Sequence, residues 1–537
     1  MQINNLYNFK NSVRHFLNID SVKLPLDVTN YPLENLCWVE PIKFRVKKQN
    51  DKYRTLRMPN ILNFACAYEQ YKNLNDFTYI KTIDPNHKRL AANISTGDFV
   101  TGEYRKQLEN DFERLCIYDN LIRVDIKNYY GRVYTHKIDY SGKNERYLSN
   151  LNLGATNGLI MGNYLSLYFA ETYLKKISND LKNQFMEVKI DCEFTYFSDD
   201  FYFYCNKNDN DQIIKIFDNV LEKYDLERNE NKLEFWTYES FNNYNIVERS
   251  WKKLIAHCNT KFKSELTNNK LHFINQLIYR MHNLADSKLK TVFINNFFKT
   301  KYFQELETNK YEVRSYDYHQ LCFIFKFSPE AMLYAVDKLD KIGSFDNSKL
   351  HKFLKVRYNE SLNEAYNEEQ LYFYFAVKLL GFDDILLETK DSVLKSDNQI
   401  LISYYLKDGL FDKDDIDNLK RSTDECYWFQ NYHLILYTDL SADLDSNIKT
   451  YLVPKNANKE NKVKSYLEFY RQNIQDRIPL IRDIDKVNLD VKSYLMLKIG
   501  ESEAAFEAQK ESKSQTEVEE VDLDLDLDLP FLINGDE

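Results

Sequence analysis

Glycine and proline are scarce in this sequence, which contains 12 glycines and 9 prolines among 537 residues. Together they make up about 4% of the chain, against roughly 12% in an average protein. Turn-rich all-β proteins and nucleotide folds built on glycine loops depend on these residues. The scarcity therefore argues against both classes and favours helices.

Paired cysteines and long apolar runs are also missing. The eight cysteines contain no CxxC pair and no regular Cys/His spacing, which argues against a disulfide framework and a zinc site. No apolar run approaches the roughly 18 residues of a membrane-spanning helix. The N-terminal sequence MQINNLYNFKNSVRHF lacks the apolar core of a signal peptide. We therefore expect a cytoplasmic protein with reduced thiols and no membrane partner.

An excess of positive charge is absent as well, since the formal net charge is -10. That charge is unevenly distributed. Residues 501–537 contain 13 acidic and 2 basic side chains, a net of -11, which leaves +1 for residues 1–500. The stretch Trp38–Met58 carries seven Lys or Arg side chains against Glu40 and Asp51, a local net of +5. The overall acidity therefore does not exclude a nucleotide or nucleic-acid substrate.

Three zones follow one another along the chain. Residues 1–260 mix strand-like and helix-like segments, residues 261–500 have helical patterns, and residues 501–537 form an acidic tail. Within the tail, Asp522–Leu529 reads DLDLDLDL, which would place four like charges on one face of a strand. We expect this tail to be disordered, the alternative being a segment that adds to a sheet edge.

Glycines mark the ends of helical runs in the second zone. Gly343, Gly381 and Gly409 each follow such a run and precede acidic residues. Glycine is favoured directly after a helix because it adopts the left-handed conformation there. The pattern predicts an irregular stack of helix hairpins, a HEAT-like helical repeat, with an ordinary helical domain as the alternative.

Three aspartates lie at the ends of apolar segments in the first zone. Leu121–Ile126 (LIRVDI) has the composition of a buried strand and includes Asp125. Cys192–Phe197 and Phe201–Cys205 flank Ser198-Asp199-Asp200, which predicts a strand, a turn and a strand. Neighbouring carboxylates repel one another unless a cation lies between them. Oxygen ligands of this kind suit Mg²⁺, with Mn²⁺ as an alternative, and two such ions serve in-line phosphoryl transfer.

Helical segments are expected around these strands. Asn163–Lys176 has helical apolar spacing and no helix breaker, and a second helix is expected near Asp211–Leu226. The predicted order is therefore strand, helix, hairpin and helix.

The order and spacing of the motifs resemble those of the reverse-transcriptase superfamily. Asp125 and Tyr130 match the first palm motif, and Gly162 with Ser166 matches the second. Phe197-Ser198-Asp199-Asp200 matches the third, with Phe in place of the common Tyr, and Lys232 matches the fourth. The fingers motifs correspond to Pro41-Ile42-Lys43, Lys52-Tyr53-Arg54 and Arg57-Met58-Pro59-Asn60.

A closer resemblance is to the abortive-infection (AbiK-like) polymerases of bacterial phage defence. It rests on YRTLRMPN from Tyr53, DIKNYYGRVYTHKI from Asp125, GLIMGNYLS from Gly158 and NENK from Asn229. That family implies protein-primed DNA synthesis without a template, a helical-repeat domain in place of a thumb, and closed homo-oligomers. Ile160-Met161 replace the Pro-Gln of many templated enzymes, which is compatible with weak template use.

The resemblance also implies roles for individual residues. Asp125, Asp199 and Asp200 would ligate magnesium, and Lys232 would protonate the leaving pyrophosphate. The substrate-binding set would comprise Lys43, Lys52 and Arg54 at the triphosphate, Tyr130 under the sugar and Gly162 beside the base pair. The ordinary alternatives are buried turn acids, a solvated basic hairpin, a core tyrosine and a surface lysine. The priming hydroxyl is not identified by the sequence, and Tyr7 is a guess.

These observations predict an α+β protein, with a reverse-transcriptase-like fingers and palm domain followed by an all-α helical-repeat domain. The expected activity is DNA synthesis from dNTPs with a covalently attached single-stranded product, in a homo-oligomer. The first alternative is a templated reverse transcriptase that copies a partner RNA. The second is a catalytically inactive helical-repeat scaffold.

Overall fold

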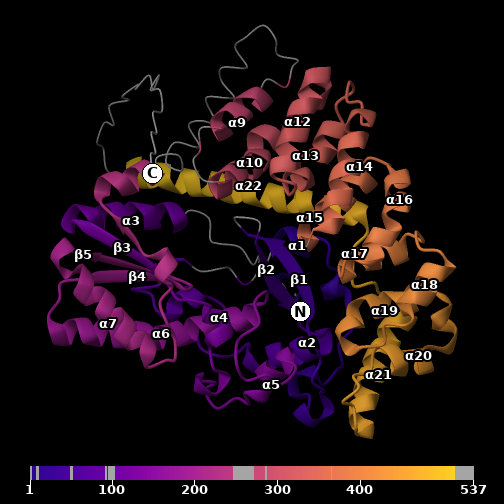
Figure 1. Ribbon diagram of the computed structural model, residues 1–537, viewed down its shortest axis with the longest axis horizontal. Helices are drawn as coiled ribbons and strands as arrows, with labels where there is room; N and C mark the ends of the chain where they lie inside the picture. Colours follow the sequence, from indigo (N-terminus) through magenta and orange to yellow (C-terminus); the bar gives the residue numbers. More distant parts are fainter. Residues whose placement is uncertain are drawn as a thin grey trace. The chain divides into compact units, whose positions relative to one another are not determined.

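The computed structural model describes residues 3–7, 11–48, 52–90, 94, 103–245, 271, 273–282, 284, 287–364 and 366–514. The chain divides into two compact units (Figure 1). The first unit comprises Met1–Ile246 and Lys352–Val487, and the second comprises Val247–His351 and Asn488–Glu537. Much of the predicted helical zone therefore belongs to the same unit as the N-terminal zone. The predicted boundary near residue 260 lies outside the described residues.

A four-stranded antiparallel sheet forms the centre of the first unit. The strand order is β4-β5-β3-β6, so the hairpin β4–β5 lies beside the earlier strand β3. The sequence predicted the first three of these strands, and the structure confirms them. The strands are β3 (Asn120–Asp125), β4 (Glu193–Phe197), β5 (Asp200–Cys205) and β6 (Glu234–Trp236).

Helix α3 (Glu103–Ile117) covers one face of this sheet (Figure 1). Its Leu108 and Leu115 pack with Leu121 of β3 and Tyr204 of β5 in one buried cluster. Since side chains alternate along a strand, Tyr202 joins the same cluster while its neighbours point to the opposite face.

Helices α6 (Tyr164–Val188) and α7 (Asn210–Glu222) cover the other face (Figure 1). Phe201 and Phe203 of β5 contact Phe217 of α7, with ring centroids 5.1 and 5.4 Å apart. The sheet is therefore buried between helices on both sides, which explains the apolar composition of its strands.

Helix α6 begins where the sequence predicts. The Asn163 side chain accepts a hydrogen bond from the backbone N–H of Ser166 at 2.9 Å, which caps the first turn. The helix continues past the predicted Lys176 to Val188 and ends at Lys189, whose φ is 57°.

A separate two-stranded hairpin precedes the sheet in the chain. Strands β1 (Ile42–Lys47) and β2 (Tyr53–Met58) pair antiparallel, with Lys47 opposite Tyr53. Helix α2 (Ile61–Tyr71) follows directly and is capped by the side chain of Asn60. Other short helices described in this N-terminal part include α1 (Asn11–Arg14), α4 (Tyr129–Arg132) and α5 (Arg146–Ser149).

The C-terminal part of the first unit is helical, as predicted. Gly381 and Gly409 end helices with φ of 76° and 66°. In the second unit, helix α13 (Ala331–Asp340) ends before Gly343, which does not adopt positive φ. Only two of the three predicted glycine caps are therefore present. The helices are α15 (Asn367–Leu379), α16 (Asp383–Leu394), α17 (Gln399–Lys407), α18 (Lys413–Leu419), α19 (Trp428–Tyr437), α20 (Leu444–Tyr451) and α21 (Glu460–Gln475).

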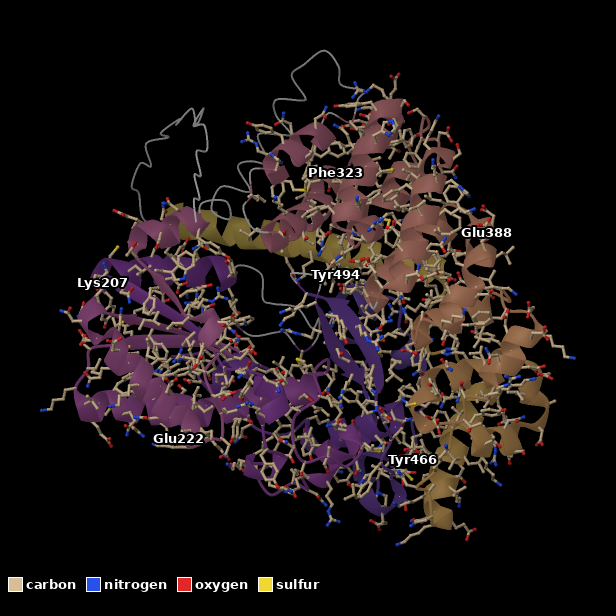
Figure 2. The ribbon with its side chains drawn as sticks, viewed as in Figure 1. Lys207, Glu222, Phe323, Glu388, Tyr466 and Tyr494 are labelled. Atoms are coloured by element: carbon tan, nitrogen blue, oxygen red, sulfur yellow. The ribbon has the colours of Figure 1, made fainter. Side chains whose placement is uncertain are left out.

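Buried polar contacts join these helices to the N-terminal part. The hydroxyl of Tyr466, labelled in Figure 2, donates to the Asn63 side chain at 2.6 Å. The Asn60 side chain donates to the Tyr470 hydroxyl, also at 2.6 Å. Such contacts between segments distant in sequence explain why they form one compact unit.

The second unit is helical in its described residues. Helix α14 begins in this unit and α22 begins in the first, so both cross the division. Residues 501–514, predicted as the start of the acidic tail, belong to α22, while Asp522–Leu529 lies outside the described residues. No helix in the described ranges has both the length and the apolar composition to cross a membrane. The helices are α9 (Phe273–His282), α10 (Ser287–Phe298), α11 (Lys301–Gln304), α12 (Ser315–Phe327), α13 (Ala331–Asp340), α14 (Ser348–Asn363) and α22 (Ile484–Ser514).

A buried histidine makes the stability of the first unit dependent on pH. The His433 ring donates from Nδ1 to the Phe429 carbonyl at 2.9 Å and accepts at Nε2 from the Leu480 N–H at 3.0 Å. Burial lowers the pKa of His433 from 6.5 to about 3. The unfolded chain therefore binds a proton that the folded chain does not, and stability falls as the pH drops from about 6.5 toward 3.

His433→Gln is expected to reduce this acid sensitivity, because Gln keeps a donor and an acceptor without titrating. The His433 contribution approaches about 1.4 kcal/mol per pH unit below the unfolded pKa. Urea denaturation at pH 7, 6, 5 and 4 compares the two proteins. Parallel loss of stability in both would contradict the assignment.

Candidate active site

The three predicted aspartates meet at one end of the sheet. Asp125, the last residue of β3, lies directly opposite Asp200, the first residue of β5. Asp199 occupies the turn before Asp200, and its carbonyl accepts from the Ile126 N–H at 3.0 Å. The turn is tight because Ser198 adopts a left-handed conformation with φ of 53°.

The environment of Asp199 disfavours its charged form. Burial, followed by the charges of Asp125 and Asp200, raises the pKa of Asp199 to about 6. A nearby cation would stabilise the charged form of this carboxylate.

Cationic and amide side chains engage the other two carboxylates. Asp125 accepts from the Asn229 side chain at 2.9 Å and pairs with Lys232. Asp200 pairs with Arg123 at 3.4 Å. The predicted Lys232 therefore lies at the acids, although half of its side chain remains exposed. Sequence reasoning missed Asn229 and Arg123 as participants, although Asn229 begins the same NENK motif.

The contacts that the carboxylates make with Lys232, Asn229 and Arg123 would compete with metal binding. Within the described part of the chain, no three His, Cys, Asp or Glu side chains are grouped as a ready-made metal site. Lys232, Asn229 and Arg123 engage carboxylate oxygens that a metal ion would use. The donor set nevertheless consists of oxygen ligands held close enough to repel one another, which suits a hard divalent cation. Binding of such an ion would require the lysine and arginine to turn away.

Tyr130 lies beside these acids on the short helix α4. Burial raises the pKa of its hydroxyl, and the charges of Glu171 and Asp199 raise it further. The Tyr130 carbonyl accepts from the Leu159 N–H at 2.7 Å, which ties α4 to the glycine-containing loop before α6.

That loop is compact and depends on its glycines. Gly158 has φ of 88°, and an added Cβ would lie 3.1 Å from the backbone oxygen of Gly131. Gly162 has φ of 109°. The carbonyl of Met161 accepts from the Arg57 N–H at 2.8 Å, so the loop also contacts β2.

Six of the seven cations of Trp38–Met58 divide into two groups in the structure. Four of them have partners other than Asp125, Asp199 and Asp200. Lys43 pairs with Glu40 at 3.2 Å, Arg45 with Asp397 at 3.7 Å, Lys47 with Glu369 at 3.5 Å, and Arg57 donates to Asn152 at 3.0 Å. The structure therefore does not bring the predicted Lys43 to the acids.

Lys48 and Arg54 form the second group. Partial burial and the positive charges of Arg54 and Lys232 lower the pKa of Lys48, while Asp125 and Asp199 oppose this effect. Lys48 is therefore within electrostatic range of the other four side chains. Sequence reasoning selected Arg54 and passed over Lys48, because a count of charges does not show which hairpin cations come near the aspartates. The predicted Lys52 is exposed at the same end of the hairpin, where its carbonyl accepts from the Lys48 N–H at 2.7 Å.

Tyr7, the guess for the priming hydroxyl, is buried in the core. Its ring packs edge-on against Phe64 with centroids 4.6 Å apart, and its exposed fraction is 0%. The structure gives no support to Tyr7 as a priming residue, because an attacking hydroxyl must reach the substrate.

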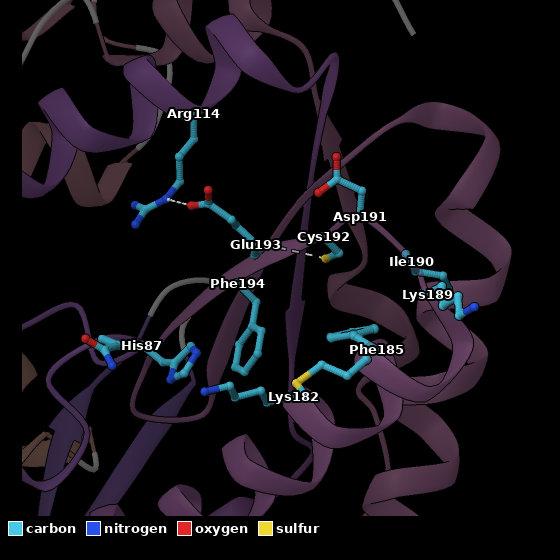
Figure 3. A pocket seen from close by; sticks show the side chains of 12 residues that line it. His87, Arg114, Lys182, Phe185, Lys189, Ile190, Asp191, Cys192, Glu193 and Phe194 are labelled. Carbon is cyan, nitrogen blue, oxygen red and sulfur yellow. Dashed lines mark hydrogen bonds and ion pairs between the residues drawn. The ribbon is translucent and has the colours of Figure 1, made fainter.

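A surface hollow of about 510 Å³ lies at the opposite end of β4 from Asp199 (Figure 3). His87 stacks on Phe194 there, with ring centroids 4.4 Å apart, and Arg114 pairs with Glu193 at 2.8 Å. The hollow mixes apolar and oppositely charged side chains and contains none of the three aspartates. The aspartates, rather than this hollow, are the better candidate for chemistry.

Comparison with known proteins gives limited results. No protein-family model matches the chain, and no curated protein matches its sequence. Among solved structures, the chain is similar to telomerase from Candida albicans in complex with a TWJ fragment of telomeric RNA, with a TM-score of 0.30 and 11% identity. The match covers 72% of this chain and 64% of that chain. A likeness this weak says nothing about activity.

Proposed function

We propose that this chain is a nucleotidyltransferase that adds dNTPs to a growing DNA strand. One observation carries the proposal: Asp125, Asp199 and Asp200 converge at one end of the sheet. Lys48 of the hairpin lies within electrostatic range of Asp125 and Asp199, and of Arg54 on the neighbouring strand. Carboxylates and cations so arranged are suited to bind a metal-chelated triphosphate and to transfer its α-phosphoryl group.

Each residue has a role in this scheme. Arg54 and Lys48 bind the phosphate oxygens, Arg54 with two donors and Lys48 as a point charge. Tyr130 packs under the sugar and disfavours a 2'-hydroxyl, so the substrate is a dNTP. Lys232 donates a proton to the departing pyrophosphate.

Magnesium would be held by Asp125, Asp199 and Asp200. When bound, it supplies positive charge that activates the attacking hydroxyl and stabilises the leaving oxygen. The chain itself orders the three carboxylates through the pairing of β3 with β5.

The proposal includes protein priming, independence from a template and a role in abortive-infection phage defence. Their support is the motif resemblance of residues 53–60, 125–138, 158–166 and 229–232. A helical-repeat domain in place of a thumb and a homo-oligomer belong to the same proposal. The competing function is a templated reverse transcriptase, which the same palm geometry would serve.

Product sequencing distinguishes these two functions. Purified protein is treated with RNase, incubated with four dNTPs and Mg²⁺, and its DNA is sequenced. We expect products without a fixed sequence, formed equally well after RNase treatment. A defined sequence that is lost after RNase treatment would establish the templated enzyme instead.

The hairpin cations provide a prediction within the site. Lys48→Ala and Arg54→Ala should each raise the KM for dNTP about tenfold or more, because each removes a charged contact to phosphate. Lys43→Ala is the matched control and should change KM by less than about twofold, since Lys43 pairs with Glu40. Steady-state incorporation measures all three. An equal effect of Lys43→Ala would contradict the division of the cations.

A further inference from the structure

The hairpin that carries Lys48 and Arg54 cannot hold its position alone. Among the described residues, β1 and β2 form a two-stranded sheet without a third strand. Such a hairpin is at best marginally stable in water, and the outer edge of β1 presents backbone N–H groups that need partners. The position of the two cations therefore depends on what contacts this edge.

Two side chains at the start of α15 occupy the edge. The Arg45 N–H donates to the side-chain oxygen of Asn367 at 2.7 Å, and the Lys47 N–H donates to a carboxylate oxygen of Glu368 at 2.8 Å. Arg45 and Lys47 are alternate residues of β1, so these are successive outward N–H groups of one strand. The acceptors substitute for a neighbouring strand.

Both acceptors are themselves fixed. Asn367 is 1% exposed, and its backbone carbonyl accepts a hydrogen bond at 3.0 Å from the side chain of Asn398, which directly precedes α17. Glu368 is 5% exposed and also accepts from the Tyr372 hydroxyl at 3.3 Å. Buried carboxylates are rare unless their oxygens are bonded, and Glu368 uses one oxygen on a strand N–H.

Side-chain contacts from β1 reinforce the edge. The Lys47 ammonium lies 4.9 Å from the centroid of the Tyr366 ring and pairs with Glu369 at 3.5 Å. On the opposite strand, the Arg57 N–H donates to the Met161 carbonyl of the glycine loop. The hairpin is thus held on one edge by α15 and on the other by the loop before α6.

We propose that Asn367 and Glu368 are positioning residues that hold the β1–β2 hairpin so that Lys48 and Arg54 face the palm acids. This inference rests on the proposed nucleotidyl transfer for its effect on substrate. Through these two side chains, the helical region would control nucleotide affinity without contacting the nucleotide.

Hydrogen exchange of the full-length protein tests the contact without relying on activity. In Glu368→Ala and in Asn367→Ala, exchange at the Lys47 and Arg45 amides respectively should accelerate about tenfold or more. Amides of Ile122 and Val124 in β3 are the internal reference and should not change. Glu364→Ala is the matched control, since it removes a nearby exposed carboxylate that does not bond the hairpin.

Steady-state kinetics supply the second readout. Glu368→Ala should raise the KM for dNTP about tenfold with kcat within about twofold, and Glu368→Gln should restore both KM and protection, because the amide oxygen still accepts. Unchanged exchange at Arg45 and Lys47 in both alanine variants would overturn the proposal. Faster exchange at these amides without a change in KM would also overturn it. If Glu368→Ala loosens β3 as well, failure of Glu368→Gln to restore protection would overturn it too. If the wild-type protein incorporates no dNTP, the proposed function fails, and the exchange data alone decide whether α15 holds the hairpin.

Discussion

Replacing Asp199 with Ala is expected to reduce dNTP incorporation by at least about 1,000-fold, roughly 4 kcal/mol of transition-state stabilisation. Asp199 lies in the turn between β4 and β5, and burial with the charges of Asp125 and Asp200 raises its pKa to about 6. The loss should therefore concern catalysis rather than folding. Removing one of three mutually repelling carboxylates is expected to leave the melting temperature unchanged or raised.

Asp211→Ala is the matched control for this prediction. Asp211 is an exposed acid in the first turn of α7. This helix follows the C-terminal end of β5, whereas the aspartates lie at the other end of that strand. Incorporation by this variant should remain within about twofold of wild type. Equal activity of Asp199→Ala and wild type would favour the inactive scaffold or a site elsewhere in the chain.

Asp111→Ala is expected to destabilise the first unit by about 3–5 kcal/mol, because it leaves a buried arginine without its carboxylate. The Arg89 guanidinium binds both oxygens of Asp111, and its Nη1 also donates to the Thr195 hydroxyl at 3.0 Å. The Tyr204 hydroxyl donates to the same carboxylate at 2.5 Å. The Arg89 N–H donates to the Tyr196 carbonyl at 2.9 Å, so the pair supports the strand that leads to Asp199.

Chemical denaturation separates this prediction from a general effect of charge removal. Glu193→Ala removes the carboxylate of an exposed pair with Arg114 and should cost less than about 1 kcal/mol. The double variant Arg89→Met, Asp111→Leu should be more stable than Asp111→Ala, because neither partner then remains buried and unpaired. A double variant less stable than Asp111→Ala would contradict this explanation.

The local parts of the fold were accessible from the sequence because their signals are local. The apolar run Leu121–Ile126 and the acids between two aromatic segments predicted β3 and the β4–β5 hairpin, with ends within a residue or two of the structure. The helical apolar spacing of Asn163–Lys176 predicted the first half of α6. Gly343 failed as a helix end because glycine permits a left-handed conformation without requiring one.

The partners of the site were not accessible because they depend on contacts between distant segments. The seven cations of the hairpin look alike in the sequence. Only the fold shows that Arg45 pairs with Asp397 and Lys47 with Glu369, while Lys48 lies within electrostatic range of Asp125 and Asp199. The grouping of residues 352–487 with the N-terminal zone has the same origin. It rests on buried contacts such as Tyr466 with Asn63, which no spacing rule predicts.

The most direct test of the account is transfer of labelled nucleotide to the protein itself. The wild-type protein and the Asp199→Ala variant are purified, treated with nuclease and incubated with one α-labelled dNTP and Mg²⁺. Each sample is then denatured and separated by size, with and without prior protease digestion. We expect label that migrates with wild-type protein, is released by protease and is absent from Asp199→Ala. Equal labelling of the two proteins, or no labelling of the wild type with any dNTP, would contradict protein-primed synthesis at Asp125, Asp199 and Asp200.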